Sequence, residues 1–386
     1  MQKFEKHSPV VVTEVTTKHE LRQFMQYPNR LYADNPNYIP SFYGDDLSDW
    51  TPGKNPAFDY CEARCWLARR DGEIVGRIGA ILSHKANDKF GTHRMRFSQV
   101  DFVDDSEVSA ALFGTVERWA REKGCDQVHG PLGFTDMDRE GMLVEGFDRR
   151  SLFFTNYNAP YYLEHLTRLG YRKDVDWIEY RITVPEPGGA EAERLHKLSE
   201  FILKRKHLHV ATVHHKSEYG PFVRQVFELV NAAYAPLYGV VELSDEQIER
   251  YANKFIPLVD PDFVCFVVDE QDQLVAFGVT ALDPSVALKH SDGRLFPFGW
   301  AGVLNDLHHS DTLIMLLTAV RPDLQAEGIN AVMMDHVCQS CNRHGVRFAE
   351  TGPMLELNDH ILAQWKRLEK EQHKRRRCFI KDLDHD

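Results

Sequence analysis

Short stretches of alternating apolar and polar residues predict strands in the first half of the chain, and apolar residues recurring every three to four positions predict helices. Arg70-Asp71-Gly72-Glu73 contains an Asp-Gly pair, which is typical of a tight turn between two strands. The predicted elements are, in order, strands 63–68, 74–82 and 96–102, helix 106–123, strand 126–129, helix 160–169 and strand 177–184. This order indicates an α/β fold.

The second half repeats this order of elements without obvious sequence identity to the first. Its predicted elements are strands 263–268, 274–281 and 313–320, helix 329–343, strand 346–350, helix 359–370 and strand 377–383. Two further helices, 219–235 and 244–258, precede them, and the second begins with the capping-box pattern Ser244-Asp245-Glu246-Gln247.

The two halves are separated at Val184-Pro185-Glu186-Pro187-Gly188-Gly189-Ala190. Two prolines and two glycines in this short stretch end any helix or central strand. A helix is predicted over 191–206. We therefore predict two domains, residues 1–184 and 191–386, joined by a linker over residues 185–190.

Length and composition fit this organisation. The 386 residues exceed the roughly 100–200 residues of a typical domain. No stretch approaches the ~18 consecutive apolar residues of a membrane span, and residues 1–20 lack a secretory signal. The seven scattered cysteines do not suggest a disulfide framework. We expect a cytoplasmic protein without a membrane partner, and the net charge of −12 leads us to expect no nucleic-acid partner.

Three short motifs have little functional weight. Cys338-Gln339-Ser340-Cys341 lies on a predicted helix without a second cysteine pair, and His214-His215 and His308-His309 lack a spacing that directs two imidazoles at one metal. We therefore expect no metal site. The basic run Lys374-Arg375-Arg376-Arg377 precedes the last strand, and we interpret it as a solvated turn.

The segment Gln325-Ala326-Glu327-Gly328-Ile329-Asn330 joins a predicted strand to a predicted helix. It resembles the phosphate-binding turn of the GNAT superfamily of acyl-CoA N-acyltransferases, Arg/Gln-x-x-Gly-x-Gly/Ala, with Asn330 in place of the final small residue. Glycine lets the backbone approach a pyrophosphate, and N–H groups at a helix N-terminus face the anion. Alternatively, Gly328 only serves the strand-to-helix turn, and Asp323 and Glu327 in the same loop would repel phosphate.

Other segments resemble an uncharacterised bacterial branch of this superfamily with tandem domains. They are residues 30–40, Lys54-Asn55-Pro56, Gly130-Pro131, residues 140–148, residues 157–162 and Leu169-Gly170-Tyr171. The resemblance covers nearly the whole chain. It implies two tandem GNAT-like domains, each a mixed, mostly antiparallel twisted sheet flanked by helices.

The resemblance also implies acetyl-CoA or another acyl-CoA as co-substrate, bound by the second domain. The implied cofactor-binding residues are Thr318, Ala319, Val320, Arg321, Gln325, Ala326, Gly328, Ile329, Asn330 and Asn358, the last of which alternatively caps the helix at residue 359. The corresponding loop of the first domain, residues 103–107, has no glycine and carries three carboxylates near the helix N-terminus. We expect this degenerate first domain not to bind coenzyme A there.

Acyl transfer to an amine requires a polarised thioester carbonyl and a base for the amine. Glu350, at the end of a predicted strand, is the candidate catalytic base; the alternative is an exposed strand-end carboxylate. The tyrosine that often serves as general acid in the family is absent, since Trp365 lies in that region.

Carboxylates and aromatic residues gather in the loops of the first domain. The candidate acceptor-binding residues are Asp136, Asp138, Glu140, Glu145, Tyr157, Asn158, Tyr161 and Tyr162. Such a set suits a cationic or peptide-like ligand, although loop packing is the alternative. Two functions follow: an N-acyltransferase acting on a primary amine of a small-molecule or peptide acceptor, or a non-catalytic scaffold that binds a small molecule or peptide between the domains. The oligomeric state is open.

Overall fold

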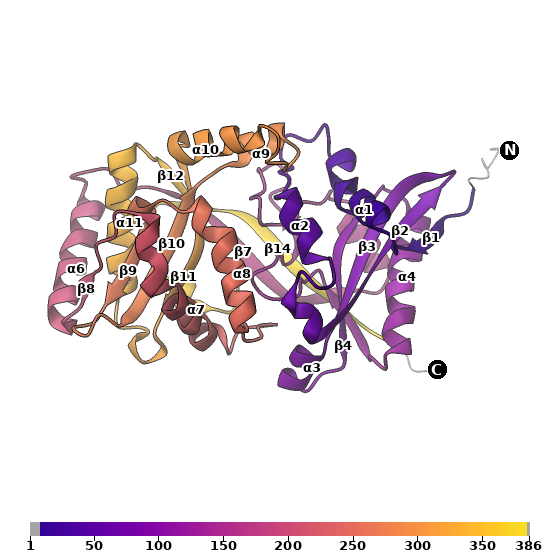
Figure 1. Ribbon diagram of the computed structural model, residues 1–386, viewed down its shortest axis with the longest axis horizontal. Coiled ribbons are helices and arrows are strands. Elements are labelled where there is room, and N and C mark those ends of the chain that lie inside the picture. The colour runs from indigo at the N-terminus through magenta and orange to yellow at the C-terminus, as the bar shows by residue number, and fades with distance from the viewer. Residues whose placement is uncertain (1–7, 384–386) are drawn as a thin grey trace. The chain divides into compact units, whose positions relative to one another are not determined.

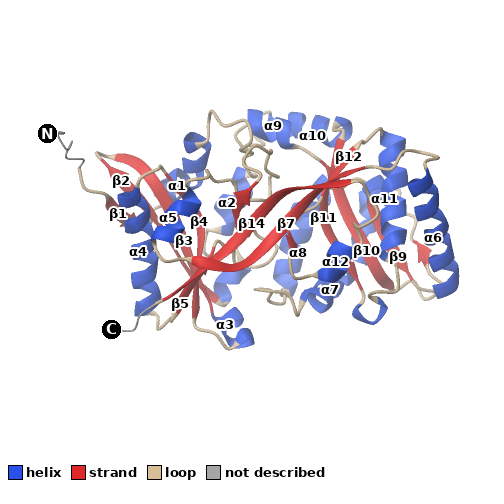
Figure 2. Ribbon diagram, turned by 180° about the vertical axis from the view of Figure 1, so that it is seen from behind, coloured by secondary structure: helices blue, strands red, loops and turns tan. Residues whose placement is uncertain are grey.

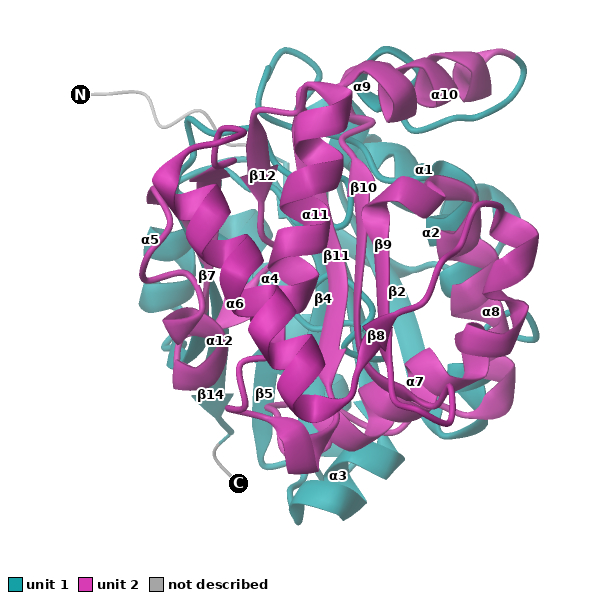
Figure 3. Cartoon of the chain, turned by 90° about the vertical axis from the view of Figure 1, so that its left-hand side faces the viewer, with its two compact units in different colours: residues 1–176, 288–297, 376–386 teal, residues 177–287, 298–375 magenta. Residues whose placement is uncertain are grey.

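The computed structural model describes residues 8–383 and divides into two compact units (Figure 3). Unit 1 comprises residues 1–176, 288–297 and 376–386, and unit 2 comprises residues 177–287 and 298–375. No helix within residues 8–383 is long and apolar enough to cross a membrane.

Unit 1 contains a mostly antiparallel sheet (Figure 1). Its strands, in sheet order, are β1 (Val11–Glu14), β2 (Cys61–Arg70), β3 (Glu73–Ser83), β4 (Arg94–Phe102), β5 (Gln127–Gly130) and the end of β14 (Lys370–Asp382). Strands β4 and β5 pair in parallel. The remaining elements of this unit are α1 (Lys18–Leu31), α2 (Tyr43–Asp49), α3 (His84–Phe90), α4 (Ser106–Glu122), β6 (Met142–Glu145) and α5 (Tyr162–Arg168).

Both faces of the sheet of unit 1 are covered by helices. Side chains of each strand alternate between the two faces and pack against a different helix on each. Trp66 and Ala68 of β2 belong to the core cluster that includes the buried residues of α4. Cys65 and Leu67, one position along, pack in a second cluster with Phe24 of α1. This two-faced burial explains why β2 and β3 are rich in apolar residues at consecutive positions.

Unit 2 has the same arrangement of a sheet with helices (Figure 2). Its strands, in sheet order, are β7 (Arg172–Thr183), β12 (Phe348–Glu350), β11 (Thr312–Val320), β10 (Leu274–Leu282), β9 (Val264–Val268) and β8 (His209–Val210), and β13 (Met354–Leu355) also pairs with β7. Its helices are α6 (Ala190–Lys206), α7 (Gly220–Tyr234), α8 (Asp245–Phe255), α9 (Ser285–His290), α10 (Gly299–His309), α11 (Asn330–His344) and α12 (Asp359–Ala363).

The two faces of this second sheet are again covered separately. Cys265 and Val267 of β9 pack in the core cluster formed with α6 and α11. Phe266, between them in sequence, stacks on Phe222 of α7 with ring centroids 4.4 Å apart. Two helices therefore cover one face, and α7 covers the other.

The last strand of each predicted domain completes the sheet of the other unit. Strand β7 precedes the linker, yet its residues 181–183 pair with β12 in unit 2. Strand β14 ends the chain, yet its residues 379–382 pair with β5 in unit 1. Two of the boundaries between the units fall inside these strands, after residues 176 and 375, and two more flank the segment 288–297 that belongs to unit 1. The predicted ranges 1–184 and 191–386 follow the order of elements, whereas the compact units follow contacts made after this exchange.

Two predictions near the C-terminus are wrong. The helix predicted over 359–370 ends at Ala363, and β14 begins at Lys370. The basic run is part of β14 and is not a solvated turn, because Lys374 and Arg376 are almost fully buried. Carboxylates compensate Lys374, and Arg376 donates to Thr155 Oγ1 and the carbonyl of Asn156. Lys374 and Arg376 are tolerated inside this strand because both charges have polar partners.

Candidate functional site

A gap between two parallel strands defines the candidate site in unit 2. Strands β11 and β12 pair only from Thr312–Phe348 to Ile314–Glu350. Beyond this point β11 continues to Val320, whereas β12 ends at Glu350. The pairing of β11 with β10 slips by one residue at the same place, so that Leu316 is the extra residue of a β-bulge. The edge of β11 beyond the bulge is therefore available to a ligand.

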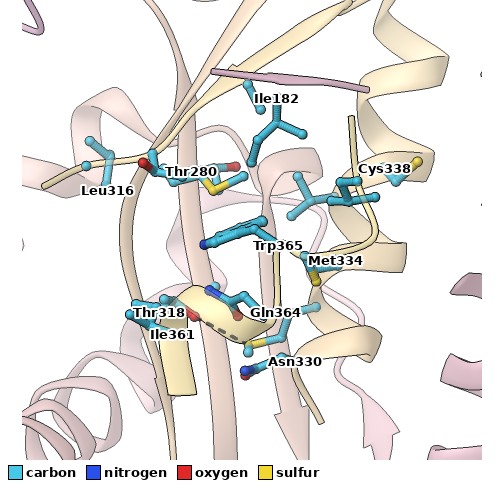
Figure 4. Close-up of a pocket in the computed structure, with 18 of the residues that line it drawn as sticks. Ile182, Thr280, Leu316, Thr318, Asn330, Met334, Cys338, Ile361, Gln364 and Trp365 are labelled. Carbon is cyan, nitrogen blue, oxygen red and sulfur yellow. Dashed lines mark hydrogen bonds between the residues drawn. The ribbon is translucent and has the colours of Figure 1, made fainter. Parts of the chain in front are cut away.

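An apolar pocket of about 170 Å³ lies in this gap (Figure 4). Residues from β10, β11, α11, the β12–β13 connection and the segment after α12 line it. Polar lining side chains are few and include Thr280, Thr318, Asn330 and Gln364. Such a lining suits an apolar ligand that is fixed by a small number of polar groups.

One face of α11 forms a long wall of the pocket. Its lining residues are Asn330, Met333, Met334, Val337, Cys338 and Cys341. These positions follow the spacing of a single helical stripe, and at 1.5 Å per residue the stripe is roughly 16 Å long. The pocket therefore extends from the N-terminus of α11 along three turns of the helix.

Helix α12 and the segment after it supply another wall. Ile361, Gln364, Trp365 and Leu368 all line the pocket. Trp365 is only 5% exposed, and its indole N–H lies 3.2 Å from the sulfur of Met354. Figure 4 shows the indole lying among Ile182, Met334 and Gln364, inside the ring of lining residues. Trp365 is therefore part of the pocket wall.

The turn that resembles a phosphate-binding loop leads into α11 as the sequence predicts. Ala326 and Gly328 have left-handed φ angles of 63° and 85°, and helix α11 begins at Asn330. In the first turn, the N–H groups of Ala331 and Val332 donate to the carbonyls of Gly328 and Ile329, both at 2.9 Å. Glu327 pairs with Lys206 at 2.7 Å, which offsets one of the carboxylates expected to repel phosphate. Ile329 is buried and anchors the turn.

The remaining predicted cofactor residues have varied surroundings. Thr318 and Asn330 line the pocket, whereas Ala319 pairs with Phe277 of β10. Arg321 is engaged by Asp323 at 2.7 Å, which leaves it less available for a phosphate. Gln325 donates weakly to the carbonyl of Val320. Asn358 caps α12 by accepting from the N–H of Ile361, and it does not line the pocket.

Glu350 lies at the vertex where β11 and β12 separate. Its neighbours Ala349 and Thr351 line the pocket, so strand alternation directs Glu350 to the other face of the sheet. The carboxylate accepts from Lys374 Nζ at 3.3 Å and lies 3.8 Å from His373 Nε2. Lys374 also pairs with the buried Glu179 at 3.2 Å. Glu350 is thus a half-buried member of a charged cluster and not a free strand end.

Unit 1 has an equivalent gap with different contents. Strands β4 and β5 pair only over Arg94–Gln127 to Arg96–His129, and β4 slips by one residue against β3 just beyond this point. The cavity here is about 30 Å³, room for roughly two water molecules. Arg77 and Asp101 line it and form a buried ion pair at 2.7 Å.

The aromatic and amide residues predicted to bind an acceptor lie beside this small cavity or in the core. Tyr157 and Asn158 line the cavity. Asn158 uses its amide to bind both backbone groups of Leu143. Tyr162 is fully buried and its hydroxyl bonds to Tyr32 and the backbone of Phe102, so this side chain packs the core. Tyr161 donates to the carbonyl of Phe102.

The predicted acidic residues are separate from the cavity. Asp138 accepts from the N–H groups of Phe134 and Thr135 and thereby shapes its loop. Burial, with the charge of Asp138 nearby, raises the pKa of Asp136 to about 6, and one carboxylate oxygen of Asp136 has no hydrogen-bond partner. Burial also raises the pKa of Glu140. Glu145 is exposed at the end of β6.

The start of α4 is occupied by a side chain of the protein itself. Asp105 Oδ1 accepts from the N–H groups of Glu107 and Val108, and the other carboxylate oxygen pairs with Arg70 at 2.5 Å. These are the N–H groups that an anion would use at a helix N-terminus. The contacts agree with the expectation that this loop does not bind a pyrophosphate.

Sequence reasoning missed one group of residues with metal-ligand chemistry. Ligand atoms of His129, Asp174 and Cys378 lie within 4.8 Å of one another in unit 1. The three residues belong to strands β5, β7 and β14, so no local spacing in the sequence indicates the group. Arg94 approaches Asp174 at 3.8 Å, which opposes binding of a cation.

Comparison with known proteins agrees with the fold. No family model matches the chain. It aligns over 98% of its length with 99% of a tandem GNAT protein from the clavulanic acid biosynthesis pathway, with a TM-score of 0.55 and 14% identity. A GCN5-related N-acetyltransferase from Sphaerobacter thermophilus matches 97% of the chain over 96% of its own length, with a TM-score of 0.52 and 12% identity. The chain therefore has the fold of tandem GNAT acyltransferases.

Two curated proteins resemble the chain in sequence. Protein YghO of Escherichia coli is 27% identical over 379 residues, which cover 97% of this chain and 95% of that protein. A bacterial ceramide synthase of Caulobacter vibrioides is 28% identical over 300 residues, which cover 76% of this chain and 75% of that protein.

Proposed function

We propose that the protein is an N-acyltransferase that transfers an acyl group from an acyl-CoA to a primary amine, with the donor bound in unit 2. The pocket between β11 and β12 is the observation that carries this proposal. It joins an apolar cavity to a turn with left-handed residues and a helix N-terminus. The GNAT fold independently supports acyl transfer.

The residues around the pocket fit an acyl-CoA. The positive end of the α11 dipole suits the pyrophosphate, and the left-handed Gly328 lets it approach closely. The edge of β11 beyond Leu316 supplies backbone groups for the pantetheine arm. The carbonyl of Thr318 already accepts from Tyr234 at 2.7 Å, which fixes this edge. The acyl group then lies in the apolar part of the pocket.

Glu350 is the base in this proposal. The amine nitrogen attacks the thioester carbonyl, the new C–N bond replaces the C–S bond, and the amine gives up a proton to the carboxylate. Coenzyme A leaves as the thiolate and takes up a proton to become the thiol. Because Glu350 lies at the vertex but on the opposite face from the pocket lining, the amine approaches from the face away from α11.

The acceptor in this proposal is an amphiphilic amine. The name of the Caulobacter relative denotes formation of ceramide, the amide of a long-chain amino alcohol. The apolar pocket is consistent with chemistry on lipid-like molecules. The predicted acceptor residues of unit 1 have mainly packing contacts, so the acceptor-binding residues are open to experiment. All seven cysteines are buried and none forms a disulfide, which supports the cytoplasmic location that we propose.

A binding protein without catalysis is the second candidate function. The ion pair between Glu350 and Lys374 favours it, because this carboxylate is already engaged by a buried ammonium at 3.3 Å. This candidate predicts that the pocket binds acyl-CoA but that no amide forms.

The test is an assay of amide formation by mass spectrometry, with acyl-CoAs as donors and a sphingoid base or short alkylamines as acceptors. The proposal predicts product together with release of the coenzyme A thiol. Glu350→Gln is expected to lower kcat about 10²–10⁴-fold while donor affinity is retained. Glu371→Gln, an exposed change on β14, is the control. Donor binding without product from any acceptor would favour the non-catalytic function.

A further inference from the structure

The pocket of unit 2 is longer than an acetyl group requires. Its α11 wall continues from Asn330, beside the phosphate-binding turn, to Cys341, three turns further on. The far part of the pocket is closed by Ile182, Val184, Pro185 and Leu195. All these side chains are apolar, so this part offers a ligand no ionic or directional contacts.

The lining is also unusually rich in sulfur. Met315, Met333, Met334 and Met354 all line the pocket, together with Cys338 and Cys341. Methionine side chains are unbranched and adapt their shape to a ligand. A wall of this kind suits a flexible hydrocarbon chain better than a rigid ring.

We propose that this far part of the pocket holds the hydrocarbon chain of a fatty acyl donor, and that Trp365 and Cys338 set the chain length that it accepts. The inference rests on the proposed function and names the donor class for the same site. Trp365 is fixed by its contact with Met354, so its ring forms a firm wall beside the chain. Cys338 lies on the α11 stripe beyond Met334, where a larger side chain shortens the space.

The assignment makes two residues, Trp365 and Cys338, responsible for the accepted chain length. Trp365→Ala removes part of the pocket wall and enlarges the space beside the hydrocarbon chain. Cys338→Phe blocks the far part of the pocket but leaves the turn at Gly328 and the edge of β11 unchanged. Gln339→Phe is the matched control, because it adds the same ring one residue along on an exposed face of α11, outside the pocket lining, although it removes hydrogen bonds to His196 and Asp335.

The experiment measures binding of free coenzyme A and of acyl-CoAs with two, eight, twelve and sixteen carbons to the full chain by calorimetry. Burial of added methylenes predicts at least about tenfold tighter binding of the twelve-carbon donor than of acetyl-CoA. Cys338→Phe is expected to abolish this preference while free coenzyme A binds as before. Trp365→Ala is expected to shift the optimum to longer chains, and Gln339→Phe to change nothing.

Intrinsic fluorescence gives a second readout. A fatty acyl-CoA is expected to change the emission of the wild-type protein, and Trp365→Phe is expected to remove most of that change. Equal affinity for all chain lengths, or an equal loss for all of them in Cys338→Phe, overturns the inference. Chain-length-dependent binding without amide formation supports it and contradicts the proposed reaction. If neither coenzyme A nor any acyl-CoA binds, both proposals fail.

Discussion

Both units have a gap between two parallel strands, but charged side chains fill the gap of unit 1 and an apolar pocket occupies that of unit 2. In each, a parallel strand pair separates just before a bulge in the longer strand, which is β4 in unit 1 and β11 in unit 2. The residues that pair across the bulge occupy equivalent positions in the two units. In unit 1, Arg77, two residues before Gly79, lies opposite Asp101. In unit 2, Gly278, two residues before Thr280, lies opposite Thr318. Both pairs line the cavity of their unit.

This single pair of positions explains much of the difference between the cavities. The guanidinium and carboxylate of unit 1 are satisfied by each other, and Arg77 also donates to the carbonyl of Phe24 and to Gln99. Glycine and threonine leave the equivalent space of unit 2 open to an apolar ligand. A fold that opens a gap therefore does not by itself make a binding site; the side chains at the gap decide whether it is filled.

The largest expected effect comes from breaking the filled gap. Asp101→Asn leaves the buried Arg77 without a charged partner and is expected to lower the free energy of unfolding of unit 1 by about 3–5 kcal/mol. Chemical denaturation followed by circular dichroism measures this loss. Asp148→Asn, at an exposed carboxylate of the same unit, is expected to have no effect. A loss below about 1 kcal/mol would show that the ion pair does not hold this gap closed.

Filling the open gap should remove binding without unfolding. A Cβ on Gly278 meets only ordinary contacts, with Met333 Cβ at 3.7 Å, so Gly278→Ala is tolerated. Gly278→Leu extends into the pocket and is expected to weaken fatty acyl-CoA binding about tenfold or more, which corresponds to about 1.4 kcal/mol. Calorimetry on both variants measures the difference. Unchanged affinity in Gly278→Leu would place the donor elsewhere.

The turn before α11 is the part of unit 2 that we propose to bind the pyrophosphate. Gly328 and Gly345 flank α11, both have a positive φ, and alanine at either is expected to cost about 1 kcal/mol of stability. Only Gly328→Ala alters the turn that we propose to bind the pyrophosphate, where its Cβ would lie 3.0 Å from Ile202 Cδ1. We expect several-fold weaker binding of free coenzyme A in Gly328→Ala alone. Equal affinities of the two variants for free coenzyme A would exclude this turn as the pyrophosphate site.

The acidic loop of unit 1 gives a smaller effect that depends on pH. Burial raises the pKa of Asp136 to about 6, above its unfolded value near 4, so the folded state binds the extra proton. The stabilisation that the protonated Asp136 gives the folded state is therefore present below about pH 4 and is lost as the pH rises through 6. Asp136→Asn is expected to raise the free energy of unfolding at pH 7 by about 1–2 kcal/mol. It is also expected to weaken the dependence of this free energy on pH between about pH 4 and 6.

Thermal unfolding from pH 4 to 7 measures the effect of Asp136. Asp138 and Glu140 add negative charge near Asp136, and Arg96 opposes it. Asp148→Asn again serves as the control. A wild-type stability that does not change between pH 4 and 6, or a mutant less stable at pH 7, would show that Asp136 has another role.

Local patterns predicted most elements of both sheets, because strand alternation, the hairpin turn at Asp71-Gly72 and the capping box at Ser244 act over a few residues. The strand–turn–helix around Gly328 could be predicted for the same reason. The exchange of β7 and β14 could not, since pairing between strands about 200 residues apart leaves no local mark. The burial of Lys374 was missed because its partners Glu179 and Glu350 lie on other strands.

The candidate site shows the same division. Thr318 and Asn330 line the pocket as the resemblance implies, but Trp365, the methionines and Gly278 do not belong to any motif. They meet only when α11, β10 and the segment after α12 pack around the gap. The role of Arg77 and Asp101 in closing the other gap likewise depends on the register between β3 and β4.

Hydrogen exchange with and without a fatty acyl-CoA tests the central claim that the open gap of unit 2, and not the filled gap of unit 1, holds the donor. The account predicts protection of residues 315–320 of β11 and of the first turn of α11. It predicts no change in residues 97–102 of β4 or in the first turn of α4. Protection confined to β4 and α4 would contradict it.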